Sequence, residues 1–164
     1  MERTKMVTLR KMENKDRDAV MSIFNHYATT GFSAYPETAV PGQYFHVLTE
    51  GAYASWIIDS PDGLVGFGIV RPFLPFPVFS KTGMMTYFIL PGHIHHGLGS
   101  LLLERLIWDA KKNGLNRIVV NVSSKNDASI RFHLKHGFVE SGRLTGVGEK
   151  FGQPFDMIWM QKTL

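Results

Sequence analysis

The sequence predicts an α/β fold in which a mixed β-sheet carries helices on its faces. Segments 55–59 and 64–70 are apolar and flank the turn sequence SPDG, a pattern typical of an antiparallel β-hairpin. A leucine-rich helical segment, 99–113, lies between two further apolar segments, 84–90 and 117–122. Because a strand, a crossover helix and a second strand make a parallel pair, the sheet contains both kinds of pairing.

Residues 1–51 predict one strand, one long helix and a loop. Val7–Lys11 alternates like a short strand. Four apolar residues recur at i, i+3, i+4 and i+7 and indicate an amphipathic helix: Val20, Ile23, Phe24 and Tyr27. Gly31 ends this helix. Segment 32–51 contains prolines and aromatic residues without a period, so we expect a loop with a short helix around Gln43–Leu48.

Prolines divide the middle of the chain. Segment 71–79 holds three of them, which excludes a central strand. Met84–Leu90 is a continuous apolar run, as in a strand covered on both faces, and Pro91 ends it. The next helix has two adjacent apolar stripes, so we expect most of it to be buried: Leu98, Leu101, Leu102, Leu103, Leu106, Ile107 and Ala110.

The last third of the chain predicts a strand, a helix and two closing strands. Arg117–Val122 is a buried strand. Asn126 or Asp127 can cap a helix that runs through His133 to His136 and stops at Gly137. Segments 138–142 and 155–162 are the closing strands. We expect a single domain over residues 1–164.

The composition excludes several classes of function. The chain has no cysteine, which excludes disulfides, thiolate metal ligands and thiol nucleophiles. Its net charge of +4 comes without a basic run, so nucleic acid is a weak hypothesis and a small anionic ligand fits as well or better. No apolar run approaches the roughly 18 residues of a membrane span. We therefore expect a cytoplasmic protein with no membrane partner.

The stretch HIHHGLGS, residues 93–100, connects a predicted strand to a predicted helix. Its glycines allow backbone N–H groups to converge on an anion at the helix N-terminus, where the dipole favours phosphate. A tight turn without a ligand is the alternative. A Walker A loop is excluded because no Gly-Lys-Ser/Thr follows, and a Rossmann fingerprint fails because residue 102 is Leu102.

The histidines of this stretch have three possible uses. His93, His95 and His96 could bind zinc with His133 or His136, although no Asp or Glu lies in the loop to complete the site. They could instead donate hydrogen bonds to a pyrophosphate. Exposed side chains without a ligand are the third possibility.

The segment FILPGHIHHGLGSLLLERLI resembles motif A of the GNAT-type N-acetyltransferases, a strand followed by Q/R-x-x-G-x-G/A and a helix. Residues 122–164 resemble the C-terminal part of phosphinothricin acetyltransferase-like members, with the N-x-x-S-x-x-x-H-x-x-x-GF segment and a later G-x-K-x-G. The likeness implies a GNAT-like mixed, mostly antiparallel sheet with a splayed central parallel pair. It also implies acetyl-CoA as acetyl donor and, since relatives are often dimers, a homodimer.

The resemblance further implies which residues hold the cofactor. The backbone of Phe88 and Ile89 would pair with the pantetheine arm, as an added strand does. Asn126 would bond the pantetheine region. The backbone amides of one continuous run would hold the pyrophosphate: His95, His96, Gly97, Leu98, Gly99 and Ser100.

Two residues depart from the family pattern. Ile94 stands where the family usually has Gln or Arg, which removes a side chain but no amide. Met84 stands where phosphinothricin acetyltransferase-like enzymes have a glutamate, and methionine cannot accept a proton. Either the amine arrives neutral, water or another residue serves as the base, or the substrate differs.

His133 occupies a position where many relatives have a tyrosine that protonates the leaving thiolate. An imidazole with a reference pKa of about 6.5 can protonate a thiolate whose thiol has a pKa near 8.5. His133 could equally be the base toward the amine, or a histidine held only by packing. Around the acceptor we expect Tyr35, Phe73, Met84 and Arg71, the last of these facing a substrate carboxylate.

These residues predict an N-acetyltransferase that moves an acetyl group from acetyl-CoA to the primary amine of a small molecule, amino-acid-like or apolar. The main alternative is an acyl-CoA-binding module without efficient turnover, which Met84 favours. A histidine-rich metal-binding protein is the third hypothesis.

Overall fold

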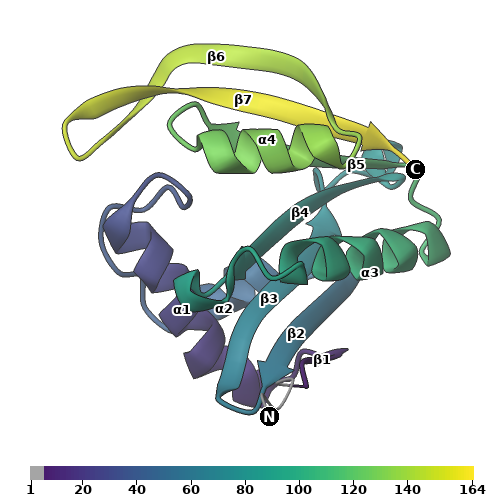
Figure 1. Ribbon diagram of the computed structural model, residues 1–164. Helices are drawn as coiled ribbons and strands as arrows, with labels where there is room; N and C mark the ends of the chain where they lie inside the picture. The colour runs from purple at the N-terminus through teal and green to yellow at the C-terminus, as the bar shows by residue number, and fades with distance from the viewer. Residues whose placement is uncertain (1–5) are drawn as a thin grey trace.

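The computed structural model describes residues 6–164 and contains a seven-stranded sheet in the order β1-β2-β3-β4-β5-β7-β6 (Figure 1). The strands are β1 (Thr8–Lys11), β2 (Ala54–Ser60), β3 (Gly63–Pro72), β4 (Thr82–Ile89), β5 (Arg117–Ser123), β6 (Val139–Lys150) and β7 (Gln153–Thr163). The α-helices are α1 (Arg17–Thr30), α2 (Tyr44–Thr49), α3 (Leu98–Lys112) and α4 (Asp127–Lys135). Only β4 and β5 pair in parallel, which confirms the predicted mixed, mostly antiparallel sheet.

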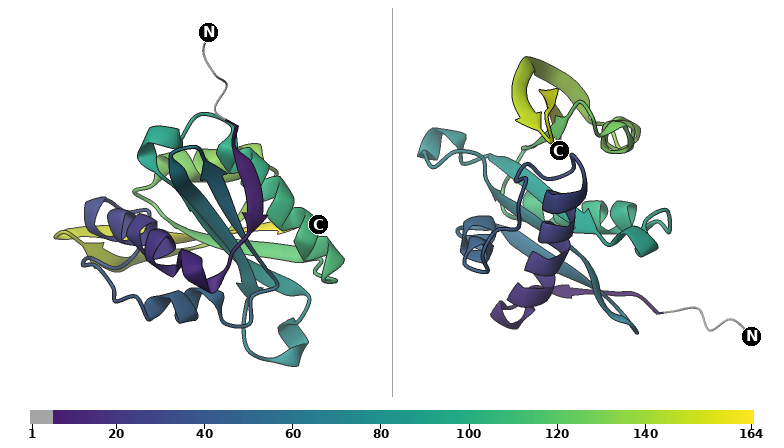
Figure 2. Two further views of the ribbon diagram at one scale, coloured as in Figure 1. Left: turned by 90° about the horizontal axis from the view of Figure 1, so that it is seen from below. Right: turned by 90° about the vertical axis from the view of Figure 1, so that its left-hand side faces the viewer.

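The helices cover the two faces of the sheet separately (Figure 2). Side chains of α1 and α2 pack with Ile57, Phe67 and Ile69 in one buried cluster. Side chains of α3 pack on the opposite face with those that alternate with the first set along the strands, such as Ile58 and Val70. The predicted helices on both faces are therefore confirmed.

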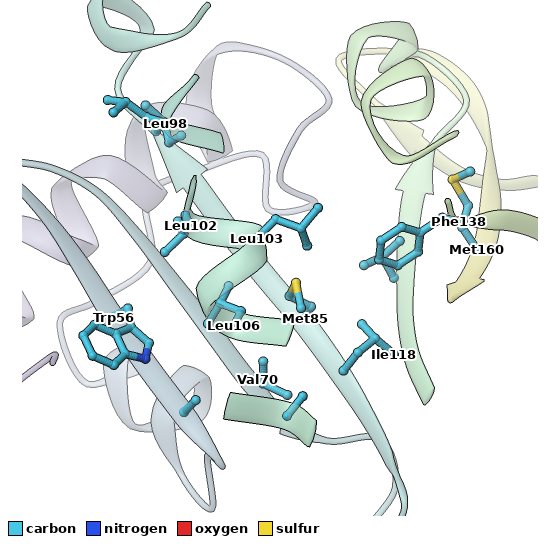
Figure 3. Close-up of a cluster of buried hydrophobic side chains, with 14 of the residues drawn as sticks. Trp56, Val70, Met85, Leu98, Leu102, Leu103, Leu106, Ile118, Phe138 and Met160 are labelled. Carbon is cyan, nitrogen blue, oxygen red and sulfur yellow. The ribbon is translucent and has the colours of Figure 1, made fainter. Parts of the chain in front are cut away.

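The helix α3 buries one stripe rather than most of its circumference. Leu98, Leu102, Leu103 and Leu106 are buried and lie against Met85 and neighbouring strand residues (Figure 3). The expectation for Leu101 was wrong, because its side chain is 41% exposed. A helix that covers a single sheet face turns its other side to solvent, and Leu101 lies on that side.

Most of the predicted elements are confirmed, with one large difference at the C-terminal hairpin. Strand β6 continues to Lys150, whereas the sequence predicted a strand only to Gly142. It pairs with β7 alone, and nearly all of its side chains are exposed. A strand without a buried face carries no apolar alternation, so its length could not be predicted from hydrophobic pattern.

The parallel pair is short, and this opens the sheet. Only Thr82–Met84 pairs with Arg117–Val119; beyond these residues β4 pairs with β3 alone. The C-terminal halves of β4 and β5 therefore separate, and a connection of eight residues, with a short 3-10 helix at Pro91–His93, joins the free end of β4 to the N-terminus of α3.

Candidate active site

The free edge of β4 presents main-chain groups to the gap between β4 and β5. The amide of Leu90 donates to the carbonyl oxygen of Val65 in β3 at 2.8 Å. Because hydrogen bonding alternates along an antiparallel pair, Phe88 also faces β3, and Tyr87 and Ile89 face the gap. The carbonyl of Ile89 accepts the hydroxyl of Tyr27 there. The main chain of Phe88, which we expected to pair with the pantetheine arm, therefore faces Phe67 of β3, whereas the main chain of Ile89 faces the gap.

The turn after β4 forms a run of free amide donors. Gly97 adopts the left-handed region with φ of 77°, and the first helical bond of α3 runs from Leu101 N to Gly97 O at 3.1 Å. Within residues 6–164, the amides of residues 95–100 donate to no main-chain acceptor. His95 also lies in the left-handed region, with φ of 64°, which is uncommon for a residue with a side chain. This arrangement can bind an anion through its backbone.

The side chains of this turn divide into exposed and anchored ones. His95 and His96 are exposed, whereas Leu98 is buried in the core under α3. The hydroxyl of Ser100 bonds to Nε2 of His136 at 2.9 Å, which ties α3 to α4. A Cβ on Gly99 would lie 3.3 Å from the Phe132 ring, so this glycine allows the two helices to approach closely.

Asn126 connects α4 to the segment that follows α1. Its Oδ1 accepts from the amide of Ser129 at 3.3 Å and thereby caps the helix, as predicted. Its Nδ2 donates to the hydroxyl of Ser33 at 3.3 Å. The side chain is half-buried beside the gap.

His133 is buried, with 4% of its surface exposed, and both ring nitrogens have partners. Nδ1 lies 2.7 Å from the carbonyl oxygen of Ser129, and Nε2 lies 2.5 Å from the hydroxyl of Tyr87. Burial lowers the pKa of His133, and the Ser129 carbonyl opposes this effect. His133 thus has no free nitrogen toward the gap, and the side chain in front of it is Tyr87.

Sequence reasoning missed Tyr87. It lies within the apolar run of β4, between Thr86 and Phe88, and no local pattern sets its hydroxyl apart from that of Thr86. Burial raises the pKa of this phenol, so Tyr87 is protonated at neutral pH.

Three of the four residues expected around the acceptor lie on β3, on β4 or just after β3. Met84 is paired in register with Arg71 on β3 and with Val119 on β5. Arg71 donates to the carbonyl of Val47 in α2 at 3.3 Å. Phe73 contacts Trp159 of β7 edge to face, with ring centroids 6.1 Å apart. A cation and aromatic rings therefore surround Met84 on the face opposite α3.

Tyr35 reaches this face from the loop after α1. Its ring stacks on Phe155 at 5.8 Å, and its hydroxyl donates to Oδ1 of Asn121 on β5 at 2.8 Å. Burial raises the pKa of Tyr35 to about 12, so the hydroxyl remains a donor at neutral pH. Sequence reasoning missed Asn121, Phe155 and Trp159, because strands distant along the chain bring them here.

Lys150 anchors the loop that carries Tyr35. It is 1% exposed, and its Nζ donates to the carbonyl of Ala34 at 2.6 Å. Burial lowers the pKa of Lys150, while Glu37 opposes this. The amide of the next residue, Phe151, donates to Glu37. The G-x-K-x-G segment thus anchors the loop that carries Tyr35.

Two further hypotheses can be compared with the structure. Across residues 6–164, His, Asp and Glu side chains form no group of three or more that could hold a metal ion. In the same part of the chain, no helix has the length and apolar character needed to cross a membrane.

Comparisons with known proteins agree with this geometry. Residues 17–138 match the model of the acetyltransferase (GNAT) family. The chain is 30% identical to phosphinothricin N-acetyltransferase of Alcaligenes faecalis, over 96% of this chain and 82% of the relative. It is 27% identical to the L-amino acid N-acyltransferase MnaT of Escherichia coli K12, over 96% and 94% of the two chains. The structure of the acetyltransferase yncA of Salmonella typhimurium, solved with acetyl-CoA, has a TM-score of 0.86 at 28% identity, over 97% and 94%.

Proposed function

The chain belongs to the acetyltransferase (GNAT) family, and from this membership we propose that it acetylates the primary amine of an amino-acid-like small molecule. It is an acetyl-CoA-dependent N-acyltransferase of the phosphinothricin acetyltransferase-like subfamily. The observation that carries the proposal is the row of free amides at residues 95–100 beside the open edge of β4.

The residues present fit acetyl-CoA, which supplies a thioester-activated acetyl group. The amides of His95 through Ser100 are oriented by the left-handed Gly97 and can hold the two phosphates. The gap-facing main chain of Tyr87 and Ile89 can pair with the pantetheine amides once Tyr27 releases the Ile89 carbonyl. Asn126 borders the same gap.

The acceptor side supports a substrate with one carboxylate and an apolar body. Arg71 is the cation beside Met84, and its guanidinium suits a carboxylate. Tyr35, Phe73 and Trp159 offer aromatic surface for the rest of the substrate. Met84 cannot accept a proton, so either the amine arrives neutral, water or another residue serves as the base, or the substrate differs. The names of the relatives, which refer to phosphinothricin and L-amino acids, support this class of acceptor.

Two finer statements belong to the same proposal. We propose a homodimer, which the exposed edge strand β6 and its apolar side chains support. We also propose a cytoplasmic location, which the absence of cysteine and the share of 20% charged residues support.

Two measurements test the activity. Acetyl-CoA at about 100 times its Kd should raise the free energy of unfolding by about 2.7 kcal/mol, seen as a higher Tm. Thiol release should then appear with L-amino acids and be weaker with the same amines lacking the carboxylate. No Tm shift at millimolar acetyl-CoA would contradict the proposal, and a shift without thiol release for any amine would favour a binding module.

The Arg71→Gln variant tests the carboxylate. It should raise KM for amino acids and leave KM for the decarboxylated amines unchanged, because only the first group offers an anion. Arg17→Gln is the matched control, since Arg17 is an exposed arginine of α1 paired with Asp18. Equal KM changes for both substrate groups would show that Arg71 does not bind the substrate carboxylate.

A further inference from the structure

We propose that Tyr87, backed by His133, carries the proton that leaves the amine nitrogen and reaches the departing thiolate. The inference rests on the proposed function and assigns its proton path to one pair of side chains. It moves the reacting group from α4, where the sequence suggested His133, to β4.

The position of Tyr87 is the first argument. It lies three positions beyond Met84, the last residue of β4 that pairs with β5, so it borders the opened part of the sheet. Its side chain lies on the α3 and α4 face and contacts Phe132 and His133, with ring centroids 6.1 and 5.7 Å away. The hydroxyl is thus held beside the gap that the cofactor enters.

The direction of the hydrogen bonds is the second argument. A carbonyl oxygen only accepts, so the short contact to Ser129 O places the hydrogen of His133 on Nδ1. Nε2 is then a bare acceptor, and the Tyr87 hydroxyl donates to it at 2.5 Å. The pair therefore has a vacant proton site at Nε2 and a transferable proton on Tyr87.

The surroundings keep this acceptor neutral. His133 packs against the ring of Phe138 at 5.0 Å, and burial lowers its pKa. The titratable group at the end of α4 that lowers the pKa of His133 is His136, whose Nδ1 donates to Phe132 O and whose Nε2 accepts from Ser100. From β7, Lys162 donates to the carbonyl of His136. Burial and His136 together disfavour a permanent positive charge on His133.

The two side chains account for both proton transfers of the reaction. The amine nitrogen forms a bond to the thioester carbon, the bond from that carbon to sulfur breaks, one proton leaves nitrogen and one joins sulfur. Oη of Tyr87 takes the proton from nitrogen while its own proton passes to Nε2 of His133. The reverse transfer then delivers a proton to sulfur and restores both side chains. The acceptor residues lie on the face opposite α3, so this path requires the reacting carbon to lie in the gap between β4 and β5. Nitrogen and sulfur share that carbon during the reaction, so a single hydroxyl at the gap can serve both.

Tyr87→Phe tests the hydroxyl while it keeps the ring. The variant should lower kcat by about 10²- to 10⁴-fold, with the Kd for acetyl-CoA within about threefold of wild type. Tyr44→Phe is the matched control and should leave kcat unchanged, because the ring of Tyr44 packs on Phe24 in α1.

A second readout needs no turnover. Thiolate absorbance of bound coenzyme A, followed against pH, gives the pKa of its thiol in the complex. When the thiol proton passes to Oη and the Tyr87 proton passes to Nε2, the Tyr87 hydroxyl donates to the thiolate, so loss of this path in Tyr87→Phe should raise the thiol pKa. Tyr44→Phe should match wild type.

His133→Gln tests the residue that acts through Tyr87. Glutamine can still accept the Tyr87 hydrogen bond but cannot take up its proton. If His133 only positions the ring of Tyr87, the variant should retain wild-type kcat; the proposal expects a loss of about 10²-fold or more. Burial lowers the pKa of His133 from its ordinary value of 6.5, so in wild type kcat should decline where the pH falls below that lowered pKa and His133 becomes protonated. This decline, the acid limb of the pH profile of kcat, should vanish in the variant.

The outcomes separate this inference from the proposed function. Wild-type cofactor binding and thiol release test the function alone. With both present, a Tyr87→Phe enzyme of unchanged kcat and unchanged thiol pKa overturns the role of Tyr87. If that variant does not fold, a wild-type kcat and an intact acid limb in His133→Gln overturn the proton path.

Discussion

Asp16 is the acidic residue whose ionisation contributes most clearly to the N-terminal packing. It is 5% exposed and accepts two hydrogen bonds from Arg10, each of 2.8 Å, and one from the amide of Glu13, also of 2.8 Å. The Arg10 guanidinium is the main cause of the lowered pKa of Asp16, while burial opposes it. Arg10 also bonds Asp59, so one guanidinium joins β1, the start of α1 and β2.

Asp16→Asn should reduce the free energy of unfolding by about 1–3 kcal/mol at neutral pH, because a charged bond to Arg10 is lost. The folded pKa lies below the ordinary value of 3.8, so this stabilisation is present above that pH and disappears as pH falls through the folded pKa. Urea unfolding at pH 7 and at pH 3 should therefore give a smaller difference at the lower pH. Asp18→Asn, at an exposed pair, is the control. An equal difference at both values of pH contradicts the argument.

At the same scale, the sequence identified site residues better than it identified their contacts. The motif around Gly97 predicted a strand, a turn and a helix N-terminus, because local backbone chemistry determines these features. The contact between Tyr87 and His133 spans 46 residues and depends on how α4 approaches β4, which no local pattern encodes. The orientation of Phe88 likewise follows from pairing with β3 and could not be derived before the register was known.

At the scale of elements, α4 begins at a residue with two contacts of different kinds. Asn126 caps the helix through Oδ1 and bonds Ser33 through Nδ2. Asn126→Ala removes both contacts and should lower the free energy of unfolding by about 1 kcal/mol. Asn126→Asp keeps the capping oxygen and should be nearly as stable as wild type in thermal unfolding.

The same pair of variants tests the cofactor role of Asn126. If its amide nitrogen bonds the pantetheine region, both variants should weaken acetyl-CoA binding, although only Asn126→Ala should be unstable. Calorimetric titration with acetyl-CoA measures this. If Asn126→Asp binds acetyl-CoA with the wild-type Kd, the side chain of Asn126 does not contact the cofactor and has only its structural contacts.

The elements also show where hydrophobic pattern predicts and where it fails. Strands β2, β3, β4 and β5 bury side chains, and their apolar runs predicted them within a few residues. Strand β6 has an exposed surface and irregular pairing between Leu144 and Gly148, so its continuation beyond Gly142 had no signal. Burial, rather than strand formation itself, is what the sequence pattern records.

At the scale of the whole molecule, β6 and β7 form a hairpin along one border of the sheet, with β6 as the edge strand (Figure 1). Several large apolar side chains of this hairpin are exposed: Val139, Leu144, Val147 and Phe151. A long edge strand with apolar side chains invites pairing with another chain unless it is covered. We propose that a second copy of this chain covers β6.

The dimer makes a prediction that is separate from catalysis. Light scattering during size-exclusion chromatography should give about twice the mass of 18.5 kDa for the wild type over a range of concentrations. Leu144→Glu combined with Val147→Glu should shift the protein toward the monomer, because two charges would be buried without partners at the interface. Val78→Glu changes an exposed apolar side chain in the proline-rich loop and should leave the mass unchanged. A wild-type protein that remains monomeric at all concentrations, or a double variant that remains dimeric, would show that β6 is not the interface.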